Sequence, residues 1–335
     1  MTWIKQHKII ALISVLAYGF FVAIFSIRIN DKQIILKGDL TSVAEGVSIN
    51  GAELNPDFYT IYVLSLDRPT LFQYAIALLN QEIDIADIHS GYDGYTLEDY
   101  FIMGQIDEAL SFQNAIMTAY DKASDIDSTI SVDAILQGYY ITYIDKRQSG
   151  LEIGDLVVGV NDLDARFTEK NEFFGVFSNH DRVTISVLRH NQRISKEIST
   201  LDSGLYGIAM EPKYQLTTTP VVTNAFDDDL VGGPSGGLIQ TLDIYTTLLN
   251  IDLEGLKVTG TGTISSDGIV GPIGGIKQKI FTAADNDVDL FFVPNENYLD
   301  ALVAYNTLKD PAFELIKVGD FDEAVEALLV RLSNG

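Results

Sequence analysis

The sequence predicts a mixed protein of the α+β and α/β classes, with an N-terminal transmembrane helix, a β-rich unit in the middle and a larger C-terminal domain. Residues 9–27 contain no charged residue, which predicts the helix. Residues 129–204 alternate short strand-like segments with glycine turns, and the last third combines helical periodicity with a short apolar strand. With 335 residues, 47% of them apolar, the chain is long enough for two or three domains.

Composition excludes several kinds of site. The chain has no cysteine, so it has no disulfide framework, no thiolate metal site and no cysteine nucleophile. Its formal net charge of −25 argues against a nucleic-acid partner, because phosphates require a basic surface, and it favours solubility instead. The sequence also lacks the nucleotide-binding pattern G-x4-G-K-[S/T] and any cluster typical of a metal site. We therefore expect no cofactor and no metal.

The N-terminus is expected to consist of a short tail, residues 1–8, and a membrane anchor, residues 9–27. Nineteen helical residues cover about 28 Å, close to the hydrocarbon thickness of a bilayer. A cleaved signal peptide is the competing interpretation, but the apolar run is longer than usual for one and no A-x-A site follows it. Basic residues flank the segment on both sides, so the charges give little information on its orientation.

A serine occupies a glycine-rich turn at the start of a predicted helix. Residues 232–237 read G-G-P-S-G-G, with Gly233 and Gly236 close to Ser235. The helix is predicted by apolar residues at helical spacing: Leu238, Leu242, Tyr245 and Leu249. The Ser235 hydroxyl is then close to unpaired backbone N–H groups and to the positive end of the helix dipole, where an oxyanion would be stabilised. Taken alone, the turn also fits a simple N-cap role for the serine.

A serine nucleophile needs a base, and lysine is the better candidate. All four histidines precede the turn, the last of them at position 190. A lysine base must be neutral near pH 7, which requires its pKa to fall by roughly three units, or about 4 kcal/mol. Lys279 lies among small and apolar residues that can desolvate its amine, whereas Lys277 is interpreted as a solvated surface lysine.

These segments resemble a known family. The serine turn, the run T-G-T-I at 261–264 with D-G-I-V-G-P-I-G-G-I-K-Q-K at 267–279, and F-F-V-P at 291–294 are similar to the proteolytic domain of Lon-type peptidases. The similarity is to the membrane-anchored PDZ–Lon-like proteins of the YlbL type in particular, which lack the ATPase domain. The resemblance implies a ribosomal protein S5 domain 2-like fold for residues 205–335 and a serine endopeptidase with a Ser-Lys dyad.

The resemblance also assigns roles to residues. It places the nucleophile at Ser235, the base at Lys279 and not Lys277, and the residue that hydrogen-bonds the lysine amine at Thr261. Gly236 stands where the family usually has alanine, which we interpret as tolerable because glycine keeps the turn open. Three aspartates at 227–229 precede the turn and are interpreted as a solvated loop, although they could also orient the site. The implied reaction is peptide hydrolysis through an acyl-enzyme.

Residues 28–128 are expected to supply the first half of the same peptidase domain. They carry a strand-like stretch at 58–65, and residues 110–119 resemble a helix that belongs to the peptidase fold in the family. An independent N-terminal domain is the alternative. The resemblance further implies a single-pass protein of the cell membrane, with everything after residue 30 outside the cytoplasm.

Residues 129–204 resemble a PDZ domain, because S-G-L-E-I-G-D-L-V-V-G-V-N at 149–161 is similar to its G-L-x-x-G-D-x-I-x-x-V-N-G signature. PDZ domains bind extended peptides by strand addition at a sheet edge. The resemblance therefore implies a groove between the strand at 139–144 and the helix at 168–177. Gly138, Tyr139 and Ile141 are its candidate peptide-binding residues. A PDZ-shaped spacer that binds nothing tightly is the alternative.

The expected partners are peptide or membrane-protein substrates and the bilayer, contacted through residues 9–27; an oligomer is compatible with the family. Because no unfolding motor is present, flexible segments are the expected substrates. The alternative function is a membrane-anchored PDZ scaffold that binds peptides without cleaving them. Hydrolysis of a non-peptide acyl group is a further alternative, and the identity of the substrate is left open.

Overall fold

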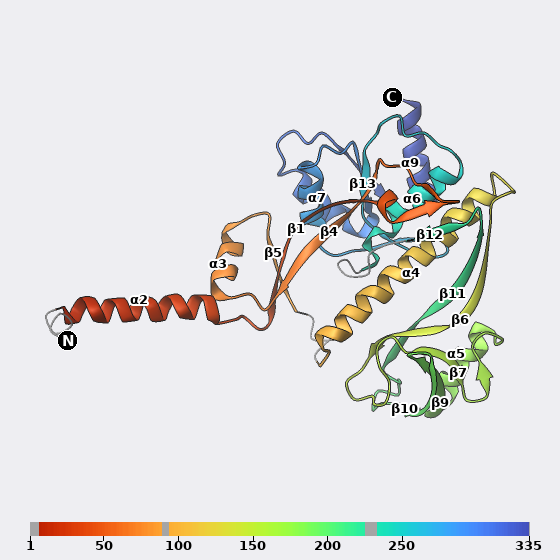
Figure 1. Ribbon diagram of the computed structural model, residues 1–335, viewed down its shortest axis with the longest axis horizontal. Coiled ribbons are helices and arrows are strands. Elements are labelled where there is room, and N and C mark those ends of the chain that lie inside the picture. Colours follow the sequence, from red (N-terminus) through yellow and green to blue (C-terminus); the bar gives the residue numbers. More distant parts are fainter. Residues whose placement is uncertain (1–6, 89–93, 225–232, 335) are drawn as a thin grey trace.

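The structure, a computed structural model, describes residues 7–88, 94–224 and 233–334. It is a mixed α/β arrangement of two bodies, from which one long N-terminal helix projects (Figure 1). The larger body is organised around a six-stranded sheet and contains both the N-terminal strands and the C-terminal third of the chain. We call it the six-stranded body. The smaller one, the middle unit, is formed by residues between them.

The projecting helix is α2 (Lys8–Ser26), one residue offset from the predicted anchor. Among the described residues it is the one helix long and apolar enough to cross a membrane, and none of its residues is buried. A signal sequence meets the same criteria of length and composition. A second, short apolar helix, α3 (Leu71–Leu79), lies close to the C-terminal end of α2 (Figure 1).

The sheet of the six-stranded body has the order β17-β16-β13-β4-β1-β5. Its N-terminal strands are β1 (Lys32–Ser42), β4 (Phe58–Asp67) and β5 (Asp84–Asp87), joined in antiparallel fashion. Its C-terminal strands are β13 (Val258–Gly260), β16 (Leu290–Pro294) and β17 (Glu314–Val318), which are parallel. The two sets meet where β13 pairs with β4, with Val258 opposite Phe58. Segments separated by about 200 residues in sequence therefore build one sheet.

Helices cover both faces of this sheet. One face carries α4 (Leu97–Ser124), α6 (Gly237–Leu248) and α9 (Phe321–Ser333), which share a core with Phe58 and Phe292. The other carries α7 (Ile276–Ala284) and α8 (Tyr298–Tyr305), which share a core with Ile61 and Phe291. Every residue of β16 is buried, as expected for a strand covered on both faces. Short elements complete the body: β2 (Val47–Ile49), β3 (Ala52–Glu53), β12 (Val222–Asn224), β14 (Thr263–Ile264), β15 (Val270–Gly271), and the single turns at Val43–Glu45, Pro234–Gly236 and Asn295–Asn297.

The middle unit is a sheet of order β10-β9-β7-β6-β11 with one helix. The strands are β6 (Ser131–Ile144), β7 (Leu156–Val160), β9 (Arg182–Arg189), β10 (Gln192–Ser199) and β11 (Ile208–Thr219); β8 (Leu163–Asp164) pairs with β7. Helix α5 (Lys170–Asn179) follows the predicted helix closely. The long strands β6 and β11 run as an antiparallel pair from this unit to the six-stranded body (Figure 1).

Helix α4 also joins the two bodies. Ile106, in its N-terminal half, is buried in the core of the middle unit, with Ile102 and Met103 packed against that core. Ala115 and Ala119, in its C-terminal half, are buried in the core of the six-stranded body. A single rigid element is thus shared by both cores.

The pairing of β6 limits where a peptide could add to the sheet of the middle unit. Tyr139 pairs with Pro212 of β11 on one side and with Val157 of β7 on the other, so this part of β6 has no free edge. Tyr139 and Ile141 are buried, and the Tyr139 ring stacks on Phe173 of α5 at 5.2 Å between centroids. Gly138 has no room for a side chain, because a Cβ there would lie 2.5 Å from the Val157 carbonyl oxygen. At Tyr139 and Tyr140, a peptide could add to β6 only by displacing β11 or β7.

Candidate active site

The turn that carries Ser235 is held by backbone and side-chain contacts from three parts of the chain. Gly233 has φ +126°, a conformation that side chains rarely adopt, and the single turn Pro234–Gly236 leads directly into α6. The Ser235 carbonyl accepts hydrogen bonds from the Gly262 N–H at 2.8 Å and from the Thr261 hydroxyl at 3.0 Å. The Ser111 hydroxyl of α4 donates to the Pro234 carbonyl at 3.1 Å. The serine is therefore fixed relative to both α4 and the segment after β13.

Lys279 reaches the serine from the second turn of α7. This helix begins after Gly275, whose φ of +69° is in the left-handed region that glycine adopts readily. The Lys279 side chain is buried, with 1% exposed, and its Nζ lies 2.7 Å from Ser235 Oγ and 2.8 Å from Thr261 Oγ1. Burial in this apolar setting lowers the pKa of Lys279 from 10.5 to about 7. A large fraction of the amine is then neutral at physiological pH.

Thr261 directs the hydrogen bonds around the amine. The residue is fully buried, its N–H is bonded to the Phe292 carbonyl at 2.9 Å, and its hydroxyl proton points to the Ser235 carbonyl. The Thr261 oxygen is left to accept an N–H from Lys279. When the amine is neutral, its lone pair can then accept the Ser235 O–H, which is the arrangement that a general base requires.

The neighbouring lysine has a different setting. Lys277 Nζ lies 2.6 Å from Asp84 Oδ1, and both side chains are partly exposed. Lys277 is therefore engaged by a carboxylate of β5 and not by the serine turn. The structure thus brings Ser235, Thr261 and Lys279 together and leaves Lys277 apart.

Gly236 and Gly237 are tightly enclosed. A Cβ at Gly236 would lie 2.9 Å from Cγ2 of Thr60 in β4, and a Cβ at Gly237 would lie 2.6 Å from the Ser111 hydroxyl. The glycine at 236 therefore has a steric reason in this chain, because Thr60 fills the space that an alanine methyl would need. The sequence alone gives no signal of this contact, since Thr60 and Gly236 are far apart along the chain.

Three polar residues of α4 support the site and are not predicted from the sequence as a group. Ser111 contacts the turn, Asn114 Nδ2 donates to the Ile264 carbonyl at 3.1 Å, and Thr118 Oγ1 donates to the Ser265 carbonyl at 3.0 Å. They are spaced i, i+3 and i+7, so they form one stripe on a mostly apolar helix face. That spacing is the signal by which they could have been found.

The first two backbone N–H groups of α6 are already hydrogen-bonded. The Leu238 N–H is bonded to the Gly262 carbonyl at 3.1 Å, and the Gly237 N–H is bonded to the Pro234 carbonyl. The donors closest to the Ser235 hydroxyl along the chain, its own N–H and that of Gly236, are the candidates for holding an oxyanion. Gly232 and the aspartates at 227–229 lie outside the described residues.

Comparison with known proteins matches the segment that contains these residues. Residues 230–331 match the model of the Lon protease (S16) C-terminal proteolytic domain. The Lon protease of Mycoplasma mobile is 37% identical over 102 residues, which are 30% of this chain and 12% of that protein. Lon protease 2 of Bacillus subtilis is 31% identical over 101 residues, 30% of this chain and 17% of that protein.

The Lon-type segment therefore spans about a third of the chain and a small part of its curated relatives. It includes Ser235, Thr261 and Lys279, and the match supports a serine-type peptidase. The matched residues do not include strands β1, β4 and β5, which complete the sheet, or helix α4, which contacts the turn. All four elements precede the matched residues in the chain.

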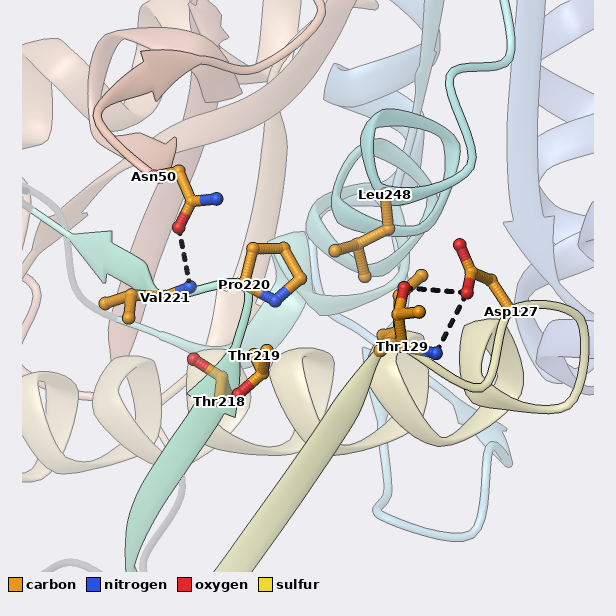
Figure 2. Close-up of a pocket in the computed structure, with 9 residues that line it drawn as sticks. Asn50, Asp127, Thr129, Thr218, Thr219, Pro220, Val221 and Leu248 are labelled. Carbon is orange, nitrogen blue, oxygen red and sulfur yellow. Dashed lines mark hydrogen bonds between the residues drawn. The ribbon is translucent and has the colours of Figure 1, made fainter.

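One pocket of the described residues lies apart from the serine turn. It lies where β6 and β11 reach the six-stranded body (Figure 2), with Asn50 Oδ1 accepting the Val221 N–H at 3.0 Å and Asp127 Oδ1 accepting the Thr129 N–H at 2.9 Å. Its lining includes neither Ser235 nor Lys279. Within the described ranges, no three His, Asp or Glu side chains gather as a metal site would require.

Proposed function

We propose that this protein is an ATP-independent, membrane-anchored serine endopeptidase that cleaves extracytoplasmic peptides or membrane-protein segments with a Ser235–Lys279 dyad. The observation that carries the proposal is the 2.7 Å approach of Ser235 Oγ to a buried lysine amine whose pKa is lowered to about 7. The Lon-type match over the same residues supports it.

In the proposed reaction, neutral Lys279 takes the Ser235 proton while Oγ attacks the scissile carbonyl. The N–H groups of Ser235 and Gly236 hold the oxyanion, and protonated Lys279 then gives its proton to the leaving amine as the C–N bond breaks. Water, deprotonated by the same amine, hydrolyses the acyl-enzyme. Thr261 keeps the amine oriented in both steps, and no cofactor takes part.

We also propose that residues 28–128 and 205–335 form one peptidase domain into which residues 129–204 are inserted. The shared sheet supports this, since β4 of the first segment pairs with β13 of the second and places Thr60 beside the serine turn. The middle unit, as a PDZ-like domain, would assist substrate recognition from surfaces other than the paired edges of β6 at Tyr139.

The sequence lacks the nucleotide-binding pattern G-x4-G-K-[S/T], which leads to a simple expectation. Cleavage of unfolded substrates should be unchanged by added ATP, because no nucleotide-binding loop is present to couple hydrolysis to unfolding. Stimulation by ATP would contradict ATP independence without affecting the assignment of the dyad.

The test of the dyad compares four forms of the full chain in lipid nanodiscs with unfolded casein as substrate: wild type, Ser235→Ala, Lys279→Met and Lys277→Met. We expect the first two variants to lose cleavage by at least about 10³-fold, as removal of either member of a nucleophile–base pair does. Lys277→Met, which removes a lysine two residues away, should retain it. Equal cleavage by all four forms would contradict the enzyme assignment and favour a peptide-binding scaffold.

A further inference from the structure

Helix α3 presents an apolar surface to solvent on most of its circumference. Its nine residues, L-F-Q-Y-A-I-A-L-L, include no charge, and its one amide, Gln73, forms a capping box with Thr70. Leu78 and Leu79 are 64% and 88% exposed, and Phe72 and Ile76 are also exposed. A short helix that is apolar almost all round is unfavourable in water, and a contiguous apolar patch marks an interaction surface.

This surface is continuous with the candidate membrane span. The Leu71 N–H donates to the Ile27 carbonyl at 3.0 Å, and the Ile29 N–H donates to the Pro69 carbonyl at 2.8 Å, so the start of α3 is hydrogen-bonded to the chain that leaves α2. The rings of Phe25 and Phe72 lie 4.5 Å apart between centroids. Figure 1 shows α3 set across the end of α2 instead of continuing its direction.

We infer that α3 is an interfacial helix that lies in the surface of the lipid bilayer, between the headgroups and the acyl chains. The inference rests on the proposed anchoring of the chain by α2. With α2 along the bilayer normal, α3 lies at the level where α2 leaves the membrane and runs across that normal. Its exposed leucines then lose contact with water, because they are buried at the boundary between headgroups and acyl chains.

Basic side chains lie at the start of α3, and the nearest acidic ones along the chain, Asp67 and Glu82, lie beyond its two ends. The whole chain has a net charge of −25, yet α3 has no acidic residue, and two exposed arginines lie at its N-terminal side. Arg28 donates a hydrogen bond from its guanidinium to the Arg68 carbonyl at 3.2 Å. Both guanidinium groups are at the depth of the phosphates in this arrangement, where basic side chains are favourable.

Lipid contact at α3 would also set the distance of the serine turn from the membrane. Strand β4 ends at Asp67, four residues before α3, and carries Thr60 beside Gly236. The seven residue-to-residue steps from Thr60 to Asp67 span about 23 Å in a strand. The nucleophile is thereby held within a few nanometres of the bilayer, where it can reach extended juxtamembrane segments of membrane proteins.

The absence of cysteine from the chain allows a direct test with single cysteines carrying an environment-sensitive fluorophore. The full chain is placed in phosphatidylcholine nanodiscs that hold one copy each. Leu79→Cys reports on α3, Leu16→Cys, 63% exposed in α2, reports on the anchor, and Leu299→Cys, 72% exposed in α8, is the matched control. We expect a blue-shifted emission at position 79, quenched best by lipids with a shallow nitroxide, and water-like emission at position 299.

The three positions separate the possible failures. Water-like emission at position 79 with lipid-like emission at position 16 would overturn the role of α3 and leave the anchor intact. Water-like emission at both positions would overturn the anchor and the inference together. Because each nanodisc holds one chain, a signal at position 79 that appears only at two copies per disc would assign the surface to self-association and overturn lipid contact.

Discussion

The turn at Ser235 and the strand at Tyr139 both follow from short sequence patterns, and they differ in what the fold does with their polar groups. At the turn, the side chains of Ser235, Thr261 and Lys279 converge on one buried amine. At the strand, the backbone groups that would bind a peptide are already paired with β11 and β7.

The contrast shows which kind of site a local sequence pattern can specify. A catalytic pattern contains the reacting atoms themselves, so bringing its segments together is enough to form the site. A strand-addition pattern provides only one side of a ladder. It can bind a peptide only where no other strand of the same chain already pairs with that edge. The turn should therefore depend strictly on its side chains, which substitutions can test.

The largest expected effect is on stability. The Lys279 pKa is about 7 in the folded state against 10.5 for an unperturbed lysine, so burying the amine costs up to about 5 kcal/mol at and below pH 7. The unfolded state binds the extra proton between pH 7 and 10.5, so the cost falls as pH rises through that window. Lys279→Met removes the cost at every pH. Its gain over wild type should be about 3 kcal/mol larger at pH 6.5 than at pH 9.5.

Urea unfolding of the full chain in detergent micelles, followed by circular dichroism, measures this difference. Titrations of all other groups are common to the two proteins and cancel in the comparison. Lys277→Met is the control, because that side chain is partly exposed and paired with Asp84. A gain for Lys279→Met that does not change with pH would show that the amine is not held neutral by the fold.

A smaller effect is expected at Thr261. Thr261→Val keeps the shape of the side chain but removes the hydroxyl that contacts Lys279 Nζ and the Ser235 carbonyl. We expect the rate at which a fluorophosphonate labels Ser235 to fall about 10- to 100-fold, which corresponds to the loss of one or two buried hydrogen bonds. The midpoint of the pH dependence of that rate should also move below pH 7, because the ammonium form of Lys279 loses the Thr261 hydroxyl as a hydrogen-bond acceptor. Thr261→Ser should restore both, and an unchanged midpoint would argue for a purely structural role.

The smallest effect concerns the contact between Gly236 and Thr60. Gly236→Ala leaves the backbone in an allowed conformation, with φ −89° and ψ −8°, but brings a methyl group to 2.9 Å from Thr60 Cγ2. Overpacking of this kind costs about 1–3 kcal/mol, so we expect a several-fold loss of rate. Thr60→Ser removes the methyl group and keeps the hydroxyl bond to the Thr41 carbonyl. Recovery of the labelling rate of Ser235 in the double variant Gly236→Ala/Thr60→Ser would confirm that the two residues are coupled. Additive effects of the two substitutions would contradict it.

Much of the architecture can be predicted from this sequence. The periodicity indicates the strand at 58–65, the helices after Ser235 and at 168–177, and the apolar N-terminal helix. The structure contains all of them, the helix at 168–177 being displaced by two residues to Lys170–Asn179. The motifs also select Ser235, Thr261 and Lys279, because the required residue types are present in them.

Other features depend on contacts between distant segments, and a local pattern does not contain them. The steric need for Gly236 comes from Thr60 on β4, and the loss of the free edge at Tyr139 comes from Pro212 on β11. The hydrogen bond from Ser111 to the turn likewise depends on where α4 packs. Each is a matter of register between segments about 70 to 180 residues apart, which the individual sequence patterns leave undetermined.

The central claim is that a buried neutral amine at Lys279 activates Ser235, and it can be tested without knowing the substrate. The measurement is the second-order rate at which a fluorophosphonate labels Ser235 in the full chain between pH 5 and 10, in wild type and in Lys279→Met. We expect the wild-type rate to rise about tenfold per pH unit up to pH 7 and then to level off, following the neutral fraction of the amine. Lys279→Met should lack this step. A wild-type rate that continues to rise toward pH 10, or equal labelling of the two proteins, would contradict the account.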